Sequence, residues 1–156
     1  MKTENLFLSA DGGIRLGDFG FARFLEDQSL VSTRCGSDGY SAPELARDDG
    51  QTVNPKLTDV WSIGVILFTI LTKSIPFDKP DMVQMNKTKC VVIRFPRKMI
   101  ITGRLRDLIG QFLTFEPTKR IKLTELENHP WLLTGRSQSI PTEQHGTNEA
   151  RSSSIA

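Results

Sequence analysis

Two oxygen-bearing side chains near the start of the chain, Asn5 and Asp18, are of the type that holds metal ions. Short β-type runs at residues 6–8 and 14–16 lie between them, separated by a turn signal at residues 11–13 whose glycines tolerate positive φ. Because a hairpin brings its two ends together, we expect Asn5 and Asp18 to meet at its open end. On this spacing alone, a capping asparagine and a turn aspartate are the alternative.

Hydrophobic spacing predicts a mainly helical body after the hairpin. Residues 57–72, which follow Pro55, are apolar on almost every side, as in a helix buried in the middle of a domain. Apolar residues recur at i, i+3, i+4, i+7 and i+8 from Leu105 to Leu113, which predicts an amphipathic helix that Pro117 stops. Shorter helices are expected at residues 79–86 and 123–126, and residues 131–133 are expected to pack back on the core.

Two segments have neither a helical nor a strand period. Residues 21–40 are rich in Ser, Thr, Asp, Gln and Gly, and a loop of that length without its own secondary structure tends to be functional. Residues 134–156 are dominated by polar types, so we expect a disordered tail there.

Length and charge place limits on the class of protein. The chain has 156 residues, enough for one domain with a core, and its net charge of +2 gives no electrostatic case for nucleic acid or a membrane surface. Cys35 and Cys90 lack metal-ligand spacing and are better explained as reduced structural thiols. Without a secretory signal pattern or an apolar run of bilayer length, we expect a cytoplasmic or nuclear protein.

Five patterns occur in order along the chain, namely Lys2-Thr3-Glu4-Asn5, Asp18-Phe19-Gly20, Gly36-Ser37 with Ala42-Pro43-Glu44, Asp59-Val60-Trp61-Ser62-Ile63-Gly64, and Arg120 with His129-Pro130-Trp131. With this set, the chain resembles the C-terminal lobe of a protein kinase over roughly residues 1–133. The resemblance implies an α+β, mainly α fold that lacks the N-terminal lobe and the helix before the catalytic loop. Residues 1–133 would form a partial kinase domain and residues 134–156 the tail. Lys2 resembles the serine/threonine class. Within that class, the stretch 33–37 and the Asp59-Val60-Trp61-Ser62 pattern resemble the calmodulin-dependent and AMP-activated kinase group.

By this resemblance, the family's reaction is transfer of the γ-phosphoryl group of ATP to protein substrates, with Mg²⁺ as the cofactor ion. Asp18 would chelate the Mg²⁺ that bridges the phosphates, and Asn5 would hold a second ion. Lys2 would be catalytic and also bind ATP, lying against the γ-phosphate and the attacking hydroxyl. A solvated lysine at the start of the chain is the alternative for Lys2.

The resemblance also assigns roles around the activation segment. Thr33 would be phosphorylated by an upstream activating kinase, although a plain solvated threonine explains this residue nearly as well. Ser37 would position a substrate hydroxyl. Glu44 and Arg120 would form a buried ion pair, and Asp59 would hold the backbone of the catalytic loop, which are structural rather than catalytic roles.

The sequence contains no Gly-rich phosphate loop and no His-Arg-Asp tripeptide, so the chain on its own is expected to be inactive. An uncovered face on the central helix is expected to make the chain poorly soluble or dependent on a partner.

Two hypotheses about function follow from these motifs. The preferred one is a serine/threonine kinase represented by a truncated sequence, and the other is a non-catalytic fragment that binds substrates or regulators through residues 32–44 and the helix near Met82. Coding sequence upstream of Met1 would distinguish them.

Overall fold

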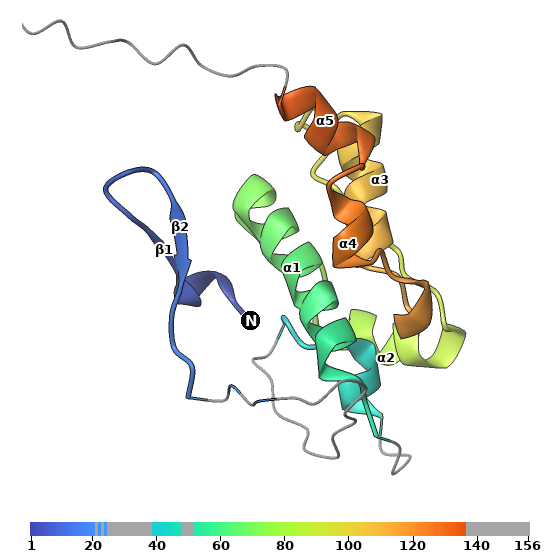
Figure 1. Cartoon of the computed structure of the whole chain (residues 1–156). Coiled ribbons are helices and arrows are strands. Elements are labelled where there is room, and N and C mark those ends of the chain that lie inside the picture. The colour runs from blue at the N-terminus through green and yellow to red at the C-terminus, as the bar shows by residue number, and fades with distance from the viewer. Residues whose placement is uncertain (21, 23, 25–38, 48–51, 137–156) are drawn as a thin grey trace, which may run out of the picture.

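The computed structural model describes residues 1–20, 22, 24, 39–47 and 52–136 of the chain. Within these residues, a small hairpin lies beside a larger helical body, and helix α1 runs through the middle of that body (Figure 1). The α+β, mainly α fold expected from the sequence is confirmed. The described elements are the strands β1 (Leu6–Leu8) and β2 (Ile14–Leu16), the helices α1 (Pro55–Thr72), α2 (Lys79–Thr88), α3 (Gly103–Phe112), α4 (Leu123–Leu126) and α5 (Pro130–Arg136), and short 3-10 helices at Thr3–Asn5, Pro43–Ala46 and Pro117–Lys119.

The hairpin forms at the residues where the turn signal predicts it. Strands β1 and β2 pair antiparallel, with Leu6 opposite Leu16. Gly12 in the turn has a φ of 79°, which a glycine adopts without steric cost. The Ser9 amide donates to the Gly13 carbonyl at 2.9 Å and closes the turn. This register places the residues that precede β1 beside those that follow β2.

Helix α1 is the central element because it is apolar on almost every face. The Asn54 side chain caps its start by accepting from the Lys56 amide at 3.0 Å, and Pro55 occupies the first turn, where a missing N–H costs nothing. The helix therefore begins two residues before the apolar run does. Its buried residues are Val60, Trp61, Ser62, Gly64, Val65, Ile66 and Phe68.

Helices α1 and α3 approach each other closely at Gly64. A Cβ atom on Gly64 would lie 2.6 Å from Phe112 Cβ and 2.9 Å from Leu113 Cδ2, so only glycine permits this contact. The Thr102 side chain caps α3 by accepting from the Leu105 amide at 3.3 Å. The buried residues of α3 are the amphipathic set that the spacing predicts, Leu105, Leu108, Ile109 and Phe112.

Helices α2 and α4 lie where the sequence predicts them, whereas residues 130–136 form a helix, α5, that the sequence did not predict. Helix α2 begins with a capping box and runs two residues further than expected. Helix α5 continues to Arg136, whereas the sequence places the start of the tail at residue 134. It continues because Thr134 Oγ1 donates to the Pro130 carbonyl at 2.7 Å and accepts from Arg104 Nη1 at 2.8 Å. The rest of the expected tail, residues 137–156, lies outside the described residues.

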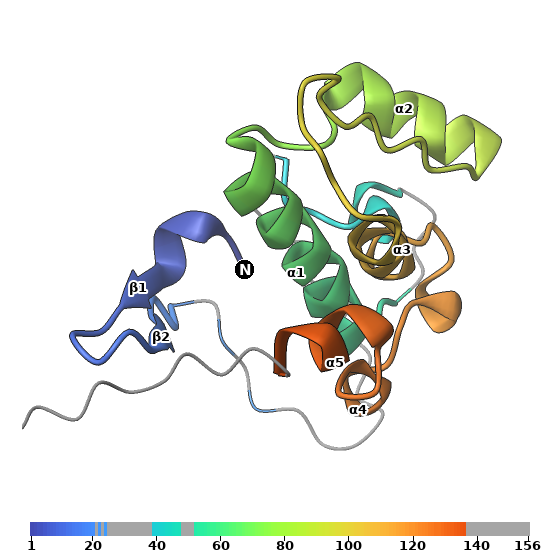
Figure 2. The ribbon, with the colours of Figure 1, turned by 90° about the horizontal axis from the view of Figure 1, so that it is seen from above.

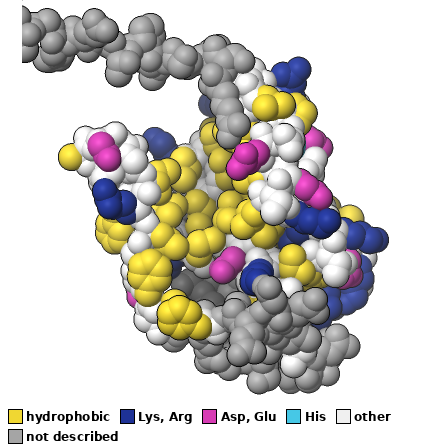
Figure 3. All heavy atoms as spheres, in the orientation of Figure 1, with side chains coloured by type: hydrophobic (Ala, Val, Ile, Leu, Met, Phe, Trp, Pro, Cys, Tyr) yellow, Lys and Arg dark blue, Asp and Glu magenta, His cyan; other side chains and the backbone are white. Residues whose placement is uncertain are grey.

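The hairpin lies beside the helical body, next to α1 (Figure 2), and several of its apolar side chains are open to solvent. Leu6 packs against the core, whereas Phe7 and Leu8 are 56% and 82% exposed. Ile70 of α1 is 59% exposed, and hydrophobic side chains gather over the hairpin and the central helix in Figure 3. This surface agrees with the uncovered face expected for the central helix.

Helix α1 also has the length and apolar composition that a membrane span requires. It lies inside the folded body, however, with seven of its residues buried. A core helix passes the same test of length and composition, so the apolar character of α1 is explained by packing against α3.

The α1–α3 contact predicts opposite effects for two glycine substitutions. Gly64→Ala should lower the free energy of unfolding by about 1–3 kcal/mol, because the new methyl group overlaps Phe112 and Leu113. Gly110→Ala in α3 is the matched control, since nothing lies within 4 Å of its added Cβ. It should raise the free energy of unfolding by roughly 0.5–1 kcal/mol through helix propensity. Urea unfolding followed by circular dichroism measures both, and equal effects would contradict the close contact.

Candidate functional site

The open end of the hairpin brings Asn5 and Asp18 together. The Asn5 side chain donates through Nδ2 to Asp18 Oδ2 at 3.5 Å. The backbone supports this pairing, because the Gly17 amide donates to the Asn5 carbonyl at 2.9 Å just beyond the last paired residues. The two side chains that the sequence places on either flank of the hairpin therefore share one site.

Asp18 adopts a left-handed backbone conformation with a φ of 59°. Asp reaches this region more readily than most residues, yet it still stores strain of order 1–3 kcal/mol that the surrounding structure must offset. Part of the support comes from the Gly20 amide, which donates to Asp18 Oδ1 at 3.4 Å. One carboxylate oxygen thus faces Gly20 while the other faces Asn5. Backbone strain at such a position is a feature of ligand-binding sites.

The donor set suits a hard cation that also binds an anionic ligand. Amide and carboxylate oxygens are the ligands that Mg²⁺ prefers, and Mg²⁺ is usually held by one or two carboxylates together with phosphate oxygens and water. Among the described residues, no three His, Cys, Asp or Glu side chains gather as a metal cage. Asn5 and Asp18 therefore fit a shared site completed by a phosphate-bearing molecule better than a closed protein site.

Lys2 and Asp59 lie close to this end of the hairpin. Lys2 has an extended backbone, directly precedes the 3-10 helix Thr3–Asn5, and makes no ion pair within 4.0 Å of any described residue. The Asp59 Oδ1 atom is 3.9 Å from the amino nitrogen of Met1. Partial burial raises the pKa of the Asp59 carboxyl, and the positive charge of that amine opposes the rise. Asp59, in the first half of α1, therefore lies next to the first residues of the chain.

A polar network that the sequence did not predict fixes the same loop to the body. Thr3 Oγ1 and the Tyr40 hydroxyl are 2.6 Å apart, and the Ser62 hydroxyl donates to the Tyr40 carbonyl at 3.1 Å. Tyr40 is buried and contributes to the core. It joins the segment before Asn5 to helix α1, so the site does not depend on the hairpin alone. Neither Thr3 nor Tyr40 carries a sequence signal for this contact, because the two residues are far apart along the chain.

Glu44 and Arg120 form a buried ion pair. Arg120 Nη1 donates to Glu44 Oε1 and Nη2 to Oε2, both at 2.7 Å, and the two residues are only 5% and 3% exposed. This two-point geometry is the strongest form of a guanidinium–carboxylate contact. The pair joins residues that are 76 positions apart in the sequence.

Arg120 uses its remaining donors on backbone carbonyls. Nε donates to Thr114 at 2.9 Å, Nη1 to Leu57 at 2.7 Å and Nη2 to Phe115 at 3.4 Å. All five N–H groups of the guanidinium therefore have an acceptor. Its carbon Cζ also lies 5.1 Å from the centroid of the Trp61 ring. Because every donor of this buried charge is hydrogen-bonded, Arg120 holds several segments in one arrangement.

Thr33 and Ser37, the expected phosphorylation and substrate-positioning residues, lie outside the described residues. The described part of the same segment begins again at Gly39, whose φ of 85° only glycine adopts freely. The Ile75 side chain lies 2.9 Å from where a Cβ of Gly39 would be. Gly39 therefore brings this segment close to the end of α1.

Comparisons with known proteins cover most of the chain, including all the site residues described above. A family model of the protein kinase domain matches residues 1–132. A probable serine/threonine-protein kinase of Dictyostelium discoideum is 37% identical over 148 residues, which are 92% of this chain and 17% of the relative. Testis-specific serine/threonine-protein kinase 2 of Mus musculus is 40% identical over 138 residues, which are 85% of this chain and 38% of the relative. Serine/threonine-protein kinase SIK2 of Gallus gallus is 36% identical over 132 residues, which are 85% of this chain and 16% of the relative. The chain spans well under half the length of these relatives.

The buried ion pair predicts a large loss of stability when its charge is removed. Glu44→Gln keeps the shape of the side chain but leaves Arg120 buried without a counter-charge, so the free energy of unfolding should fall by about 3–5 kcal/mol. Urea unfolding measures the change. A loss below about 1 kcal/mol, the usual value for an exposed pair, would contradict the structural role of Glu44.

Arg94→Ala provides the matched control, because Arg94 Nη1 and Asp81 Oδ1 form an ion pair of the same 2.7 Å length at the surface. Its loss should cost far less stability than the loss of the Glu44 charge, because solvent screens an exposed pair. The Arg94 hydrogen bond lowers the pKa of the Asp81 carboxyl, so the small contribution of this pair is present near neutral pH and disappears as the pH falls through that lowered pKa.

Proposed function

Because the chain belongs to the protein kinase family, we propose that it forms the metal-holding part of a serine/threonine kinase active site, which transfers the γ-phosphoryl group of ATP to hydroxyl groups of protein substrates. The observation that carries this proposal is the 3.5 Å approach of the Asn5 amide to the Asp18 carboxylate at the open end of the hairpin. The three relatives named above, all serine/threonine-protein kinases, support the serine/threonine class. Within it, the motifs of the chain are most like the calmodulin-dependent and AMP-activated kinase group.

The proposed roles follow from the charge of the reaction. Phosphoryl transfer spreads negative charge over several oxygens, and bound Mg²⁺ would neutralise it. Asp18 would hold one Mg²⁺ ion and Asn5 a second, and these ions would supply positive charge to the phosphates. Lys2, which has no ion-pair partner among the described residues, would place its ammonium group against the γ-phosphate and the attacking hydroxyl.

We further propose how the rest of the chain serves this reaction. Thr33 would be phosphorylated by an upstream activating kinase, and Ser37 would position the substrate hydroxyl. Glu44, Arg120 and Asp59 would hold the activation segment and the catalytic loop in place without touching the reacting atoms. Residues 1–133 would be the kinase part, residues 134–156 a tail, and the site of action the cytoplasm or the nucleus.

A paramagnetic ion tests the metal site directly. In the presence of ATP and Mn²⁺, which replaces Mg²⁺, the amide NMR signals of Asn5, Gly17 and Asp18 should broaden, because the ion relaxes nearby nuclei. Asp18→Asn removes the carboxylate ligand, so the apparent affinity for Mn²⁺–ATP should fall by about tenfold or more.

Asp11→Asn is the control for this experiment. Asp11 is a carboxylate on the same hairpin, but it lies in the turn at the opposite end, where it accepts from the Gly13 amide at 3.1 Å. Its replacement should leave the broadening unchanged. Broadening that persists in Asp18→Asn, or that disappears only in Asp11→Asn, would refute the proposed site.

A further inference from the structure

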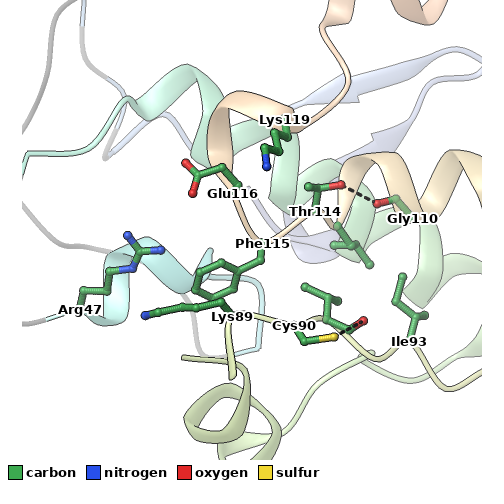
Figure 4. A pocket seen from close by; sticks show the side chains of 11 residues that line it. Arg47, Lys89, Cys90, Ile93, Gly110, Thr114, Phe115, Glu116 and Lys119 are labelled. Atoms are coloured by element: carbon green, nitrogen blue, oxygen red, sulfur yellow. Dashed lines mark hydrogen bonds between the residues drawn. The ribbon is translucent and has the colours of Figure 1, made fainter. Parts of the chain in front are cut away.

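A second site lies away from the hairpin, in a cavity of about 660 Å³ between the ends of helices α2 and α3 (Figure 4). Arg47, which follows the 3-10 helix Pro43–Ala46, closes one side of it. A volume of this size is within the range of about 300–1,000 Å³ that is usual for ligand pockets. None of the residues that line the cavity belongs to the site around Asn5 and Asp18.

Positive charge dominates the rim of the cavity. Arg47, Lys89 and Lys119 line it together with a single carboxylate, Glu116. No described residue forms an ion pair within 4.0 Å of any of these four side chains. The Nε atom of Arg47 is buried and lacks a hydrogen-bond partner among the described residues. A buried donor without an acceptor is costly, and a ligand oxygen would remove that cost.

Two of the cations are held against one aromatic ring. The Arg47 Cζ atom is 5.0 Å and the Lys89 Nζ atom is 5.3 Å from the centroid of the Phe115 ring. In Figure 4, the Lys89 side chain runs along the ring and the Arg47 guanidinium approaches it from the side. Contact with the ring orients both charges before any ligand arrives, which lowers the entropy lost on binding.

Lys89 stands where a glycine is usual. It caps the end of α2 with a φ of 57°, and its amide donates to the Met85 carbonyl at 2.8 Å. Glycine is the common residue at a left-handed helix end because it carries no steric penalty there. Lys89 adopts this strained conformation and places a cation at the cavity. Strained backbone of this kind occurs at binding sites.

The walls of the cavity are apolar. Val91, Ile93 and Leu113 line it beside the Phe115 ring, so a ligand can bury a hydrophobic group while its charges meet the rim. Free phosphate would leave these walls unused. A nucleic acid would need many more phosphate contacts than three cations supply, and the net charge of the whole chain is only +2.

We propose that this cavity binds an acidic segment of a partner protein, with one large apolar side chain against the Phe115 ring and flanking carboxylates paired with Arg47, Lys89 and Lys119. The site is independent of the reaction proposed above, because it uses different residues from different elements. It would attach a partner to the helical body and leave the hairpin end open.

A fluorescent synthetic peptide tests the proposal on the full 156-residue chain. The probe is Asp-Asp-Glu-Phe-Leu-Glu-Asp, and binding is followed by fluorescence anisotropy. The double variant Lys89→Glu, Lys119→Glu should weaken binding by about tenfold, because it reverses two exposed charge contacts. Lys98→Glu, an exposed lysine that does not line the cavity, should change it by less than about twofold.

Gly110→Leu tests the contribution of the cavity volume to binding while leaving the charged side chains unchanged. Gly110 lines the cavity, and nothing lies within 4 Å of a Cβ added there, so a larger side chain projects into open space without disturbing the fold. It should abolish peptide binding without lowering the melting temperature, because leucine is a better helix former than glycine. A peptide with Ala in place of Phe and Leu should bind about tenfold more weakly or not at all, since it loses the apolar contact.

Cys90 reports the place of binding, because it is an exposed free thiol that lines the cavity. The probe peptide should slow alkylation of Cys90 by iodoacetamide, read by mass spectrometry of the digested chain, and the Ala peptide should not. Equal binding by Gly110→Leu, equal binding by the Ala peptide, or binding of an RNA oligonucleotide or tripolyphosphate in preference to the peptide would each overturn the proposal.

Discussion

Arg120 carries its charge where almost no solvent reaches, and the way its donors are satisfied determines how the rest of the chain is arranged. Glu44 lies before α1, the Leu57 carbonyl lies in the first turn of α1, and the carbonyls of Thr114 and Phe115 follow α3. One guanidinium therefore holds three segments that are distant in sequence. Hydrophobic packing between α1 and α3 alone would leave the segment around Glu44 free to take other positions, because packing has no preferred direction.

Both sites described above depend on this arrangement. Glu44 belongs to the same short segment as Tyr40, whose hydroxyl contacts Thr3 beside the end of the hairpin where Asn5 and Asp18 meet. On the other side, Phe115 accepts from Arg120 through its carbonyl and presents its ring to Arg47 and Lys89 in the cavity. A disturbance of the ion pair would thus reach the hairpin through Tyr40 and the cavity through Phe115.

The parts of the structure that local signals specify were predictable from the sequence. The hairpin follows from two short β-type runs around a glycine-containing turn, and α3 follows from its apolar spacing. The contacts that position the sites were harder to predict because they join distant residues. Nothing in the sequence around Thr3 indicates Tyr40 as a partner, and Lys89 occupies a helix end where glycine would be expected. The tail was predicted to begin at residue 134, inside α5, because the contact of Thr134 with Arg104 is tertiary.

Stability alone does not explain why a charged pair occupies the centre of this fold. Replacing a buried ion pair by well-packed apolar residues is often neutral or stabilising, because desolvation offsets most of the attraction between the charges. An apolar pair at positions 44 and 120 would fill the same space but could not accept or donate the directional bonds that fix Leu57, Thr114 and Phe115. The hairpin needs such fixed support, since an isolated two-stranded sheet is marginal in water and Asp18 is strained. The ion pair therefore contributes geometry more than free energy, and the approach of Asn5 to Asp18 is part of what that geometry maintains.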